Sequence, residues 1–445
     1  MKVLIITYYF PPSNSAGCFR WIRFVNQLKK MGWEPIILTV SRSFEFYLNY
    51  DLSLQDRLPD NLRIYRTYSF ECVSGYPMPV QQISDSKRFV LSSKIFKRGL
   101  FEVRKRLHNI CSKAFFPDEK IGWIPFAYIK ALKIIKNHDV KAVITSGMPH
   151  STHLTGVLLK NKIDIKWLAD FRDPWTDCEY ISCNFRSTWR ERLEKYLERK
   201  VVVACDNVIL TTDSTRDLFM TKYQSISDKF HTITNSIDYE QFEKNQPIKY
   251  EKISLVYCGN FFGKRSPKYF LRGLALFLKT HPEAKSKVEV HFAGSFGVDE
   301  SSGKWNREFI SEYALSDIVT AHGKLPHSKC LSMLSGADLL LLISAPIITD
   351  GLYIPGKIFE YLAAKKPILA MVKGQGAISK LIKETDSGWV AEVDNSEDIA
   401  KALSLYWEDI TNNATNNFSF SGLKNYTIES TTERLSALIK NTINA

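Results

Sequence analysis

Short apolar runs alternate, through most of the chain, with longer segments in which apolar residues recur at helical spacing. The first run is residues 2–8, KVLIITY, and the second is residues 35–40, PIILTV. Between them a small-residue loop at 13–17 leads into a segment of helical periodicity that stops at Gly32. This order predicts a strand, a helix and a parallel strand joined by a right-handed crossover. The loop at 13–17 would then lie at the carboxyl edge of the sheet, where open α/β sheets bind ligands.

The same alternation begins again at residue 253 with ISLVYCGNF, and three further apolar runs follow: VEVHFAGSF, ADLLLLIS and KPILAMV. Small residues come directly after each run. We therefore predict a second α/β domain with its own parallel sheet. The expected boundaries are residues 1–245 for the first domain, 246–411 for the second and 412–445 for a mostly helical tail.

Length and composition agree with two globular domains. The chain has 445 residues, more than one ordinary hydrophobic core accommodates. No apolar run approaches the roughly 20 residues needed to span a bilayer, and residues 1–10 lack the small-residue cleavage site of a signal peptide. The eight cysteines are scattered without a C-x-x-C pair, so reduced thiols are expected. We interpret the chain as a cytoplasmic protein.

The formal charge of +13 indicates an anionic partner, and much of it lies in residues 85–116. This segment carries nine Lys and Arg against two acidic residues, with apolar residues at helical spacing. It is typical of a basic amphipathic helix on an anionic membrane surface. A core helix with a solvated basic face is the alternative. A nucleic-acid partner is not expected, because no recognised nucleic-acid module is present.

A glycine-rich loop opens into a short predicted helix at residues 351–369, GLYIPGKIFEYLAAKKPIL. Gly356 and Lys357 would place backbone N–H groups and a positive side chain at the positive end of the helix dipole, which favours a diphosphate. Glu360 lies three residues later on the same face and can accept hydrogen bonds from sugar hydroxyls. A nucleotide-sugar pocket is one interpretation, and an amphipathic helix with ordinary surface charges is the other.

A second set of cations follows the first strand of the second domain. The loop GNFFGKRSPKYF places Lys264, Arg265 and Lys268 around Gly263, directly before a predicted helix. Small residues with three cations suit a phosphate group.

In the first domain, charged residues follow an apolar strand in IKWLADFRDPW: Asp170, Arg172 and Asp173. Charges after the carboxyl end of a buried strand indicate a site in this architecture. The alternative is a helix cap with a salt bridge that holds a loop. His150 follows the preceding predicted strand and is a further candidate, with a capping or solvated histidine as its alternative. Residues 190–199 are expected to form a charged surface helix with a favourable pair between Glu191 and Lys195.

Five motifs in this order resemble the retaining nucleotide-sugar glycosyltransferases of family 4, which have the GT-B fold: YYFPPSNSAG, ADFRDPW, NSIDYEQF, YCGNFFGKRSP and PGKIFEYLAAKKPIL. The resemblance implies an α/β protein of two Rossmann-like, doubly wound domains that face each other across a cleft, with a C-terminal helix returning to the first domain. It also implies a donor nucleotide in the second domain, an acceptor in the first and no obligatory metal. The absence of a D-x-D triplet agrees with this.

The resemblance also implies roles for individual residues. Glu360 would bind the ribose hydroxyls of the donor. Three groups would hold its diphosphate: Arg265 with either Lys264 or Lys268, Gly356 with Lys357, and Gly17 from the first domain. Asp170, Arg172 and Asp173 fall where the family often has a histidine near the transferred sugar, and His150 could replace that histidine.

One position departs from the family pattern. Many members carry a glutamate eight residues before the position of Glu360, and this chain has Leu352 there. Asp350 could supply a carboxylate from a shifted loop.

The expected function is the transfer of a hexose-type sugar, with retention, from a nucleotide diphosphate sugar to a glycan or lipid-linked glycan in bacterial-type surface polysaccharide assembly. A UDP-sugar is the expected co-substrate, no other cofactor or metal is expected, and the enzyme would be peripheral on the inner face of the membrane. A nucleotide-sugar epimerase of the same architecture and a catalytically silent membrane-associated subunit are the alternatives.

Overall fold

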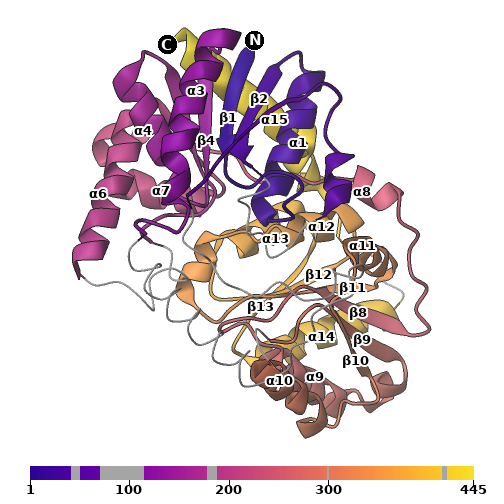
Figure 1. The fold of residues 1–445 in the computed structure, drawn as a ribbon. Helices are drawn as coiled ribbons and strands as arrows, with labels where there is room; N and C mark the ends of the chain where they lie inside the picture. The colour runs from indigo at the N-terminus through magenta and orange to yellow at the C-terminus, as the bar shows by residue number, and fades with distance from the viewer. Residues whose placement is uncertain (42–50, 71–114, 178–187, 298–299, 413–417) are drawn as a thin grey trace, which may run out of the picture. The chain divides into compact units, whose positions relative to one another are not determined.

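The computed structural model describes residues 1–41, 51–70, 115–177, 188–297, 300–412 and 418–445 (Figure 1). These residues form two compact units. The first comprises Met1–Leu210, Met220–His231 and Thr432–Ala445, and the second comprises Thr211–Phe219 and Thr232–Thr431. The main part of the second unit thus begins at Thr232, with Thr211–Phe219 added from earlier in the chain, whereas the sequence analysis placed a single boundary at residue 245. The predicted basic segment at 85–116 lies outside the described residues, apart from Phe115 and Phe116.

The sheet of the first unit has seven described strands in the order β3-β2-β1-β4-β5-β6-β7. Their bounds are β1 Lys2–Thr7, β2 Glu34–Val40, β3 Arg63–Thr67, β4 Ala142–Gly147, β5 Lys166–Phe171, β6 Asn207–Leu210 and β7 Phe230–Thr232. The pairs from β3 to β6 are parallel, with Ile5 of β1 opposite Ile37 of β2 and Ile144 of β4. These strands read as continuous apolar runs because helices cover both faces of the sheet.

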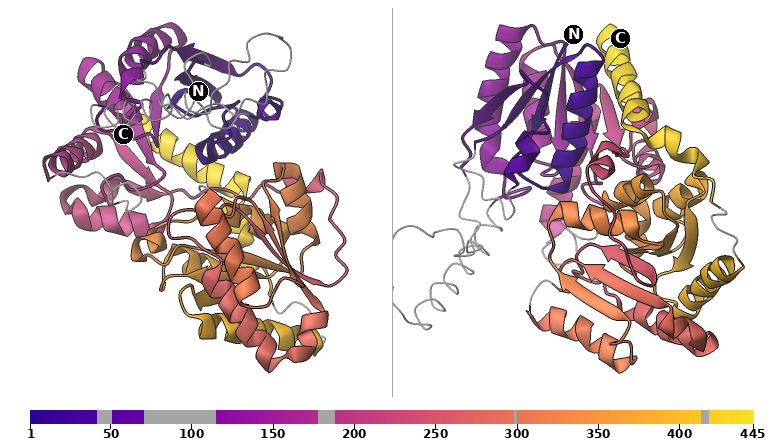
Figure 2. Two further views of the ribbon diagram at one scale, coloured as in Figure 1. Left: turned by 60° about the horizontal axis from the view of Figure 1, so that its bottom comes forward. Right: turned by 90° about the vertical axis from the view of Figure 1, so that its right-hand side faces the viewer.

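Helices cover the two faces of this sheet according to the direction of each crossover. The helices of this part of the chain are α1 Ala16–Lys30, α3 Ile124–His138, α4 Thr152–Lys162, α6 Thr188–Ala204 and α7 Asp213–Lys222, with short 3-10 turns at Leu52–Gln55, Ile121–Trp123 and Gln224–Lys229. α1 joins β1 to β2, whereas α3, α4 and α6 lead to strands on the other side of β1. Right-handed crossovers therefore place α1 on one face and α3, α4 and α6 on the other, as Figure 2 shows.

The last helix, α15 (Ile428–Asn444), begins in the second unit and ends in the first. Leu435 and Ile439 are fully buried there. The Trp33 indole N–H donates to Ser436 Oγ at 2.8 Å, and Asn207 Nδ2 donates to Thr442 Oγ1 at 2.8 Å. The predicted return of the C-terminal helix to the first domain is therefore confirmed.

The sheet of the second unit has six described strands in the order β10-β9-β8-β11-β12-β13, and all pairs are parallel. The strands are β8 Ile253–Cys258, β9 Val288–Ala293, β10 Val319–Gly323, β11 Leu339–Ile343, β12 Ile368–Val372 and β13 Gly388–Glu392. The helices are α8 Glu240–Glu243, α9 Lys268–Thr280, α10 Glu300–Glu312, α11 His327–Gly336, α12 Lys357–Ala364, α13 Ala377–Thr385 and α14 Ser396–Thr411, with 3-10 turns at Pro282–Ser286, Ile348–Leu352 and Ser421–Tyr426.

Each face of the second sheet has its own hydrophobic core. Phe270 of α9, Phe309 of α10 and Trp407 of α14 pack on one face. Leu331 of α11, Ile358 of α12 and Leu381 of α13 belong to the core on the other face. Both units are therefore doubly wound, parallel α/β folds, and the predicted fold class of two Rossmann-like domains is confirmed. Among the described helices, none combines the length and the apolar character needed to span a membrane.

Candidate functional site

The predicted anion site at Gly356 lies at the start of α12, in the connection between β11 and β12. Gly356 is the N-cap of α12, is exposed and has helical dihedral angles, φ −54° and ψ −31°. No heavy atom lies within 4 Å of the place that a Cβ would take. The protein's own packing therefore does not require glycine here, whereas a ligand that approaches the backbone would require it.

Lys357 and Arg265 both place their charge near one buried tyrosine. The Lys357 ammonium lies 4.0 Å from the ring centroid of Tyr257, the penultimate residue of β8. Burial raises the pKa of Tyr257, and the charge of Arg265 opposes that rise. The Tyr257 hydroxyl and Arg265 Nε are buried without a hydrogen-bond partner among the described residues. Both cations therefore place positive charge near the carboxyl end of a central strand, the usual place for an anionic ligand in this fold.

The loop at 259–267 that carries Arg265 is fixed to the end of the neighbouring strand β9. Phe261 N donates to the Ser295 carbonyl at 2.8 Å, and Ser295 N donates to Asn260 Oδ1 at 2.8 Å. Gly263 has φ +59°, which favours glycine. The Arg265 guanidinium lies 5.0 Å from the ring centroid of Phe262. A fixed loop holds the cation in place before a ligand binds.

The other two predicted cations of this loop lie differently. Lys264 is exposed. Lys268 is the first residue of α9, and its ammonium lies 5.4 Å from the ring centroid of Phe309 in α10. Of the three predicted loop cations, Arg265 is therefore the one whose charge acts on Tyr257, the residue that Lys357 contacts.

Glu360 forms a hydrogen bond that the sequence analysis did not find. Its Oε1 lies 3.0 Å from Nε2 of His327, the first residue of α11. Both side chains remain partly exposed, 23% for Glu360 and 40% for His327. His327 follows a separate strand, and no local pattern in the sequence marks it as a partner of Glu360. The pair holds the carboxylate in one orientation at the sheet's carboxyl edge.

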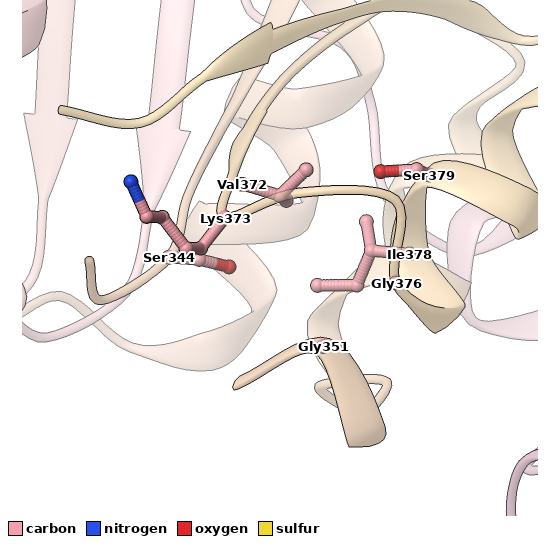
Figure 3. Close-up of a pocket in the computed structure, with 7 residues that line it drawn as sticks. All are labelled: Ser344, Gly351, Val372, Lys373, Gly376, Ile378 and Ser379. Atoms are coloured by element: carbon pink, nitrogen blue, oxygen red, sulfur yellow. The ribbon is translucent and has the colours of Figure 1, made fainter. Parts of the chain in front are cut away.

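A small pocket lies beside this region, at the carboxyl ends of β11 and β12 (Figure 3). Its lining comprises Ser344, Gly351, Val372, Lys373, Gly376, Ile378 and Ser379. A Cβ on Gly376 would lie 2.4 Å from Gly351 Cα, so the close approach of the two loops requires glycine. Lys373 is held by Glu392 and Asp394, each at 2.9 Å. Leu352 follows Gly351, and its carbonyl accepts hydrogen bonds from Thr212 and Thr215. The side chain of Asp350 lies outside those that the structure describes.

In the first unit, Asp170 occupies a supporting position. It is fully buried in β5, and its carboxylate accepts hydrogen bonds from Arg20 Nη2 at 2.8 Å and from Ser146 Oγ at 2.8 Å. Arg20 Nε donates a further bond at 3.3 Å. A carboxylate held in this way acts on a substrate only through its partners. The salt-bridge alternative from the sequence therefore describes Asp170, and the catalytic interpretation does not fit its burial.

Arg172 accounts for the glycine at position 17. Its Nε donates to the Gly147 carbonyl at 2.6 Å, and a Cβ on Gly17 would lie 1.7 Å from its Nη1. Gly17 at the start of α1 therefore makes room for the guanidinium within the first unit. Asp173 is half-buried beside Arg172. Burial raises the pKa of Asp173, the Arg172 charge lowers it and the Asp170 charge raises it further.

His150 is buried with both ring nitrogens lacking a hydrogen-bond partner among the described residues. Its ring stacks on Trp175, with centroids 5.2 Å apart and planes 6° apart. Burial, followed by the charges of His153 and Arg172, lowers the pKa of His150 well below its ordinary value. The imidazole is therefore neutral at neutral pH, and its polar atoms are available for hydrogen bonds with a ligand.

His153, which the sequence analysis did not single out, lies one helical turn along from His150. The Trp167 indole N–H donates to Thr145 Oγ1 at 2.8 Å, and the same hydroxyl is hydrogen-bonded to His153 Nδ1 at 2.9 Å. Burial lowers the pKa of His153 to about 3, with a smaller contribution from Arg172.

Asp118 is a second residue that the sequence analysis missed. Its carboxylate accepts hydrogen bonds from Ser151 N at 2.8 Å and from Ser151 Oγ at 2.7 Å, and thereby fixes the start of α4 next to His150. Burial raises the pKa of Asp118. Because Asp118 lies 33 residues from Ser151 in the sequence, no local sequence motif identifies it as the partner that fixes the start of α4. Among the described side chains no group of three His, Cys, Asp or Glu residues is placed to hold a metal ion.

Residues 238–419 match the family model described as glycosyl transferases group 1, and residues 87–241 match the model described as glycosyltransferase family 4. A search of the curated proteins found no match.

Solved structures share the fold along the whole chain. HepE (Alr3699) of Anabaena in complex with UDP is 11% identical, with 99% of this chain and 100% of that chain covered and a TM-score of 0.62. The lipopolysaccharide outer core galactosyltransferase WaaB is 10% identical, with 99% of each chain covered and a TM-score of 0.57. The UDP-GlcNAc 2-epimerase of Methanocaldococcus jannaschii is 13% identical, with 99% and 100% covered and a TM-score of 0.56. The family models together with these neighbours support a glycosyltransferase of GT-B type.

Proposed function

We propose that this glycosyltransferase of GT-B type moves a hexose-type sugar from a nucleotide diphosphate sugar to a glycan or lipid-linked glycan in surface polysaccharide assembly. The observation that carries the proposal is that Arg265 and Lys357 both place positive charge near Tyr257, with Glu360 less than one helical turn from Lys357. Two cations suit the diphosphate and the carboxylate suits the ribose hydroxyls. A UDP-sugar is the proposed donor, supported by the complex of HepE with UDP.

The proposed reaction proceeds with retention. The bond between the anomeric carbon and the diphosphate oxygen breaks, the acceptor oxygen bonds to the same face of the sugar, and the acceptor's proton passes to the departing diphosphate oxygen. Negative charge grows on the diphosphate as the sugar gains positive charge. Arg265, Lys357 and the backbone N–H groups at the start of α12 would stabilise this leaving group. No protein nucleophile and no metal ion takes part in the proposed step.

The first unit would act on the sugar and the acceptor. His150 is neutral and has two buried ring nitrogens to offer, so we assign it a hydrogen bond to a sugar hydroxyl rather than proton transfer. Arg172 and Asp173 lie at the same sheet edge and would orient the acceptor. Asp170 would position Arg20 and Ser146.

The test is nucleotide release from UDP-hexoses, with and without candidate glycan acceptors. Arg265→Ala is expected to lower turnover about 100- to 1,000-fold, the usual cost of one group that stabilises charge in the transition state. Arg272→Ala is the matched control, because Arg272 lies on the exposed side of α9 and pairs with Glu397. Equal turnover in the Arg265 variant would overturn the site assignment.

The same assay separates the alternatives. An epimerase would change the sugar of the donor without an acceptor and without a transfer product. A silent subunit would bind or process none of the donors, and Leu352 at the family's glutamate position would then explain the loss. The likeness to the archaeal epimerase concerns the fold alone.

A further inference from the structure

Helix α6 exposes a row of large apolar side chains that Arg199 and Lys200 interrupt before its last member. Among its residues, Trp189 is 61% exposed, Leu193 37%, Tyr196 58% and Val203 52%. These positions are spaced by four, three and seven residues, so they lie along one side of the helix. α6 lies at the outer edge of the helices on its side of the sheet (Figure 1). Large apolar side chains in a row on a surface helix indicate an interaction surface.

Basic residues flank this row. Arg192, Lys195, Arg199 and Lys200 are all exposed. Glu191 is paired with Lys195 at 2.6 Å, as the sequence predicted. The outward side of α6 therefore combines aromatic and aliphatic groups with an excess of positive charge.

Two of the three acidic residues of α6, Glu194 and Glu198, point inward, whereas the expectation was a charged surface helix. Glu198 is fully buried, accepts hydrogen bonds from Thr176 N and Tyr223 OH, and pairs with Lys222 at 2.6 Å. Glu194 is also buried, and its carboxylate lies 3.6 Å from Arg190. Because these contacts fix the inner side of the helix, they also fix which side faces out.

The apolar surface continues beyond α6. The Trp189 and Phe116 rings lie 6.4 Å apart, and the Arg190 guanidinium lies 5.3 Å from the Phe116 ring centroid. Arg190 Nη2 also donates to the Phe115 carbonyl at 3.4 Å. Aromatic and basic groups therefore alternate over two separate segments of the first unit.

We infer that the outward side of α6 is a docking surface for an anionic lipid bilayer. Trp and Tyr favour the bilayer interface, the aliphatic side chains enter the acyl boundary, and the exposed cations attract anionic headgroups. Charge complementarity selects the lipid surface over a neutral protein groove, because such a groove offers no anionic group to Arg192, Arg199 and Lys200, whereas Lys195 is already paired with Glu191. The inference does not depend on the proposed transferase activity, because lipid binding is measured without donor or acceptor.

The test is co-sedimentation of the full chain with phosphatidylcholine vesicles, with and without phosphatidylglycerol. The expected result is binding to the anionic vesicles that weakens with salt, and little binding to neutral vesicles. The double variants Trp189→Ser with Tyr196→Ser, and Arg192→Glu with Arg199→Glu, are each expected to lower the partition coefficient at least tenfold. Trp305→Ser, at a half-exposed tryptophan of α10 in the second unit, is the matched control and should bind as the native chain does.

An unchanged thermal midpoint checks that the α6 variants fold. Failure of the native chain to bind anionic vesicles overturns the inference. Undiminished binding by both double variants also overturns it and moves lipid contact elsewhere, for instance to residues 85–116. A concentration-dependent dimer that Trp189→Ser dissociates would assign the row to self-association instead.

Discussion

Glu360 is the residue on which ribose recognition depends in this account. Its carboxylate is oriented by His327 and lies on the same short helix as Lys357. Hydrogen bonds to a charged group contribute about 1.5–3 kcal/mol each. Glu360→Ala is therefore expected to weaken UDP binding about 10- to 100-fold in calorimetric titration.

Deoxy analogues of UDP test whether Glu360 contacts the ribose hydroxyls. The native chain should bind 2′-deoxy-UDP or 3′-deoxy-UDP more weakly than UDP, and Glu360→Ala should no longer distinguish at least one of them from UDP. His327→Ala should weaken UDP binding by a smaller factor, because His327 acts through the carboxylate. The exposed Glu408 of α14 offers a control substitution to Ala. A variant of Glu360 that still distinguishes both deoxy ligands would refute its role.

Asp170 gives a second prediction at this scale, of stability rather than activity. Asp170→Ala leaves the buried Arg20 guanidinium without its carboxylate, which costs about 3–5 kcal/mol in comparable buried pairs. We expect a lower unfolding midpoint in urea. Replacing Arg20 by Met in the same chain should restore part of the loss. Wild-type stability with abolished turnover in Asp170→Ala would instead return the residue to direct catalysis.

Acid sensitivity follows from the buried histidines. The pKa of His153 is about 3 in the folded chain and near 6.5 when unfolded, so between these values the unfolded state binds the proton and stability falls as the pH falls. The loss is about 1.4 kcal/mol per pH unit per histidine. When the pH falls from 6.5 to 5, the free energy of unfolding of the His153→Asn variant should therefore decrease by about 2 kcal/mol less than that of the native chain. Urea unfolding at the two pH values measures this difference. Equal losses would show that His153 is not buried and neutral.

The sequence identified the residues of the candidate site better than it identified their partners. Glu360 and Lys357 were predictable because three-residue spacing places them on one face of a helix. His327 and Tyr257 were not, since each lies on another element of the sheet edge. The burial of Asp170 was not predictable for the same reason: its partners Arg20 and Ser146 come from different parts of the chain, and only their convergence shows that the carboxylate is buried.

At the scale of elements, alanine substitutions at Gly356 and Gly17, two glycines at helix starts, are expected to have opposite effects. Gly356→Ala fits open space and a helical conformation, so it should leave stability unchanged or raise it by about 0.4–1 kcal/mol. It should nevertheless weaken UDP binding, because the new methyl group would occupy the approach to the backbone. Gly17→Ala should displace Arg172 and lower turnover without changing UDP affinity of the second unit. Thermal unfolding and calorimetry on both variants check the pair of expectations.

Elements were predictable where the periodicity is long, as in β1, α1, β8 and α12. The buried and exposed sides of α6 were not predictable, because the sequence of a highly charged helix does not show which glutamates face the interior. Glu198 is buried by contacts with Thr176, Tyr223 and Lys222, which lie outside the helix, and the exposed row of apolar residues can be recognised only after those contacts are known.

At the scale of the whole molecule, the C-terminal helix closes the first unit although the chain directly before it, from Thr232 onward, belongs to the second. Ile439→Ala removes a fully buried side chain and should cost about 2–5 kcal/mol of stability. Because Ile439 belongs to the first unit, UDP affinity should stay within twofold of the native value. A parallel loss of affinity would show that nucleotide binding is not confined to the second unit.

The most direct test of the central claim is calorimetric titration of UDP into the full chain without metal, compared with an Arg265→Ala, Lys357→Ala double variant. We expect saturable binding of UDP by the native chain and at least a 100-fold loss of UDP affinity in the variant, with an unchanged thermal midpoint in the absence of ligand. Native binding that the double substitution leaves intact, or no UDP binding by the native chain at all, would contradict the assignment of the nucleotide site.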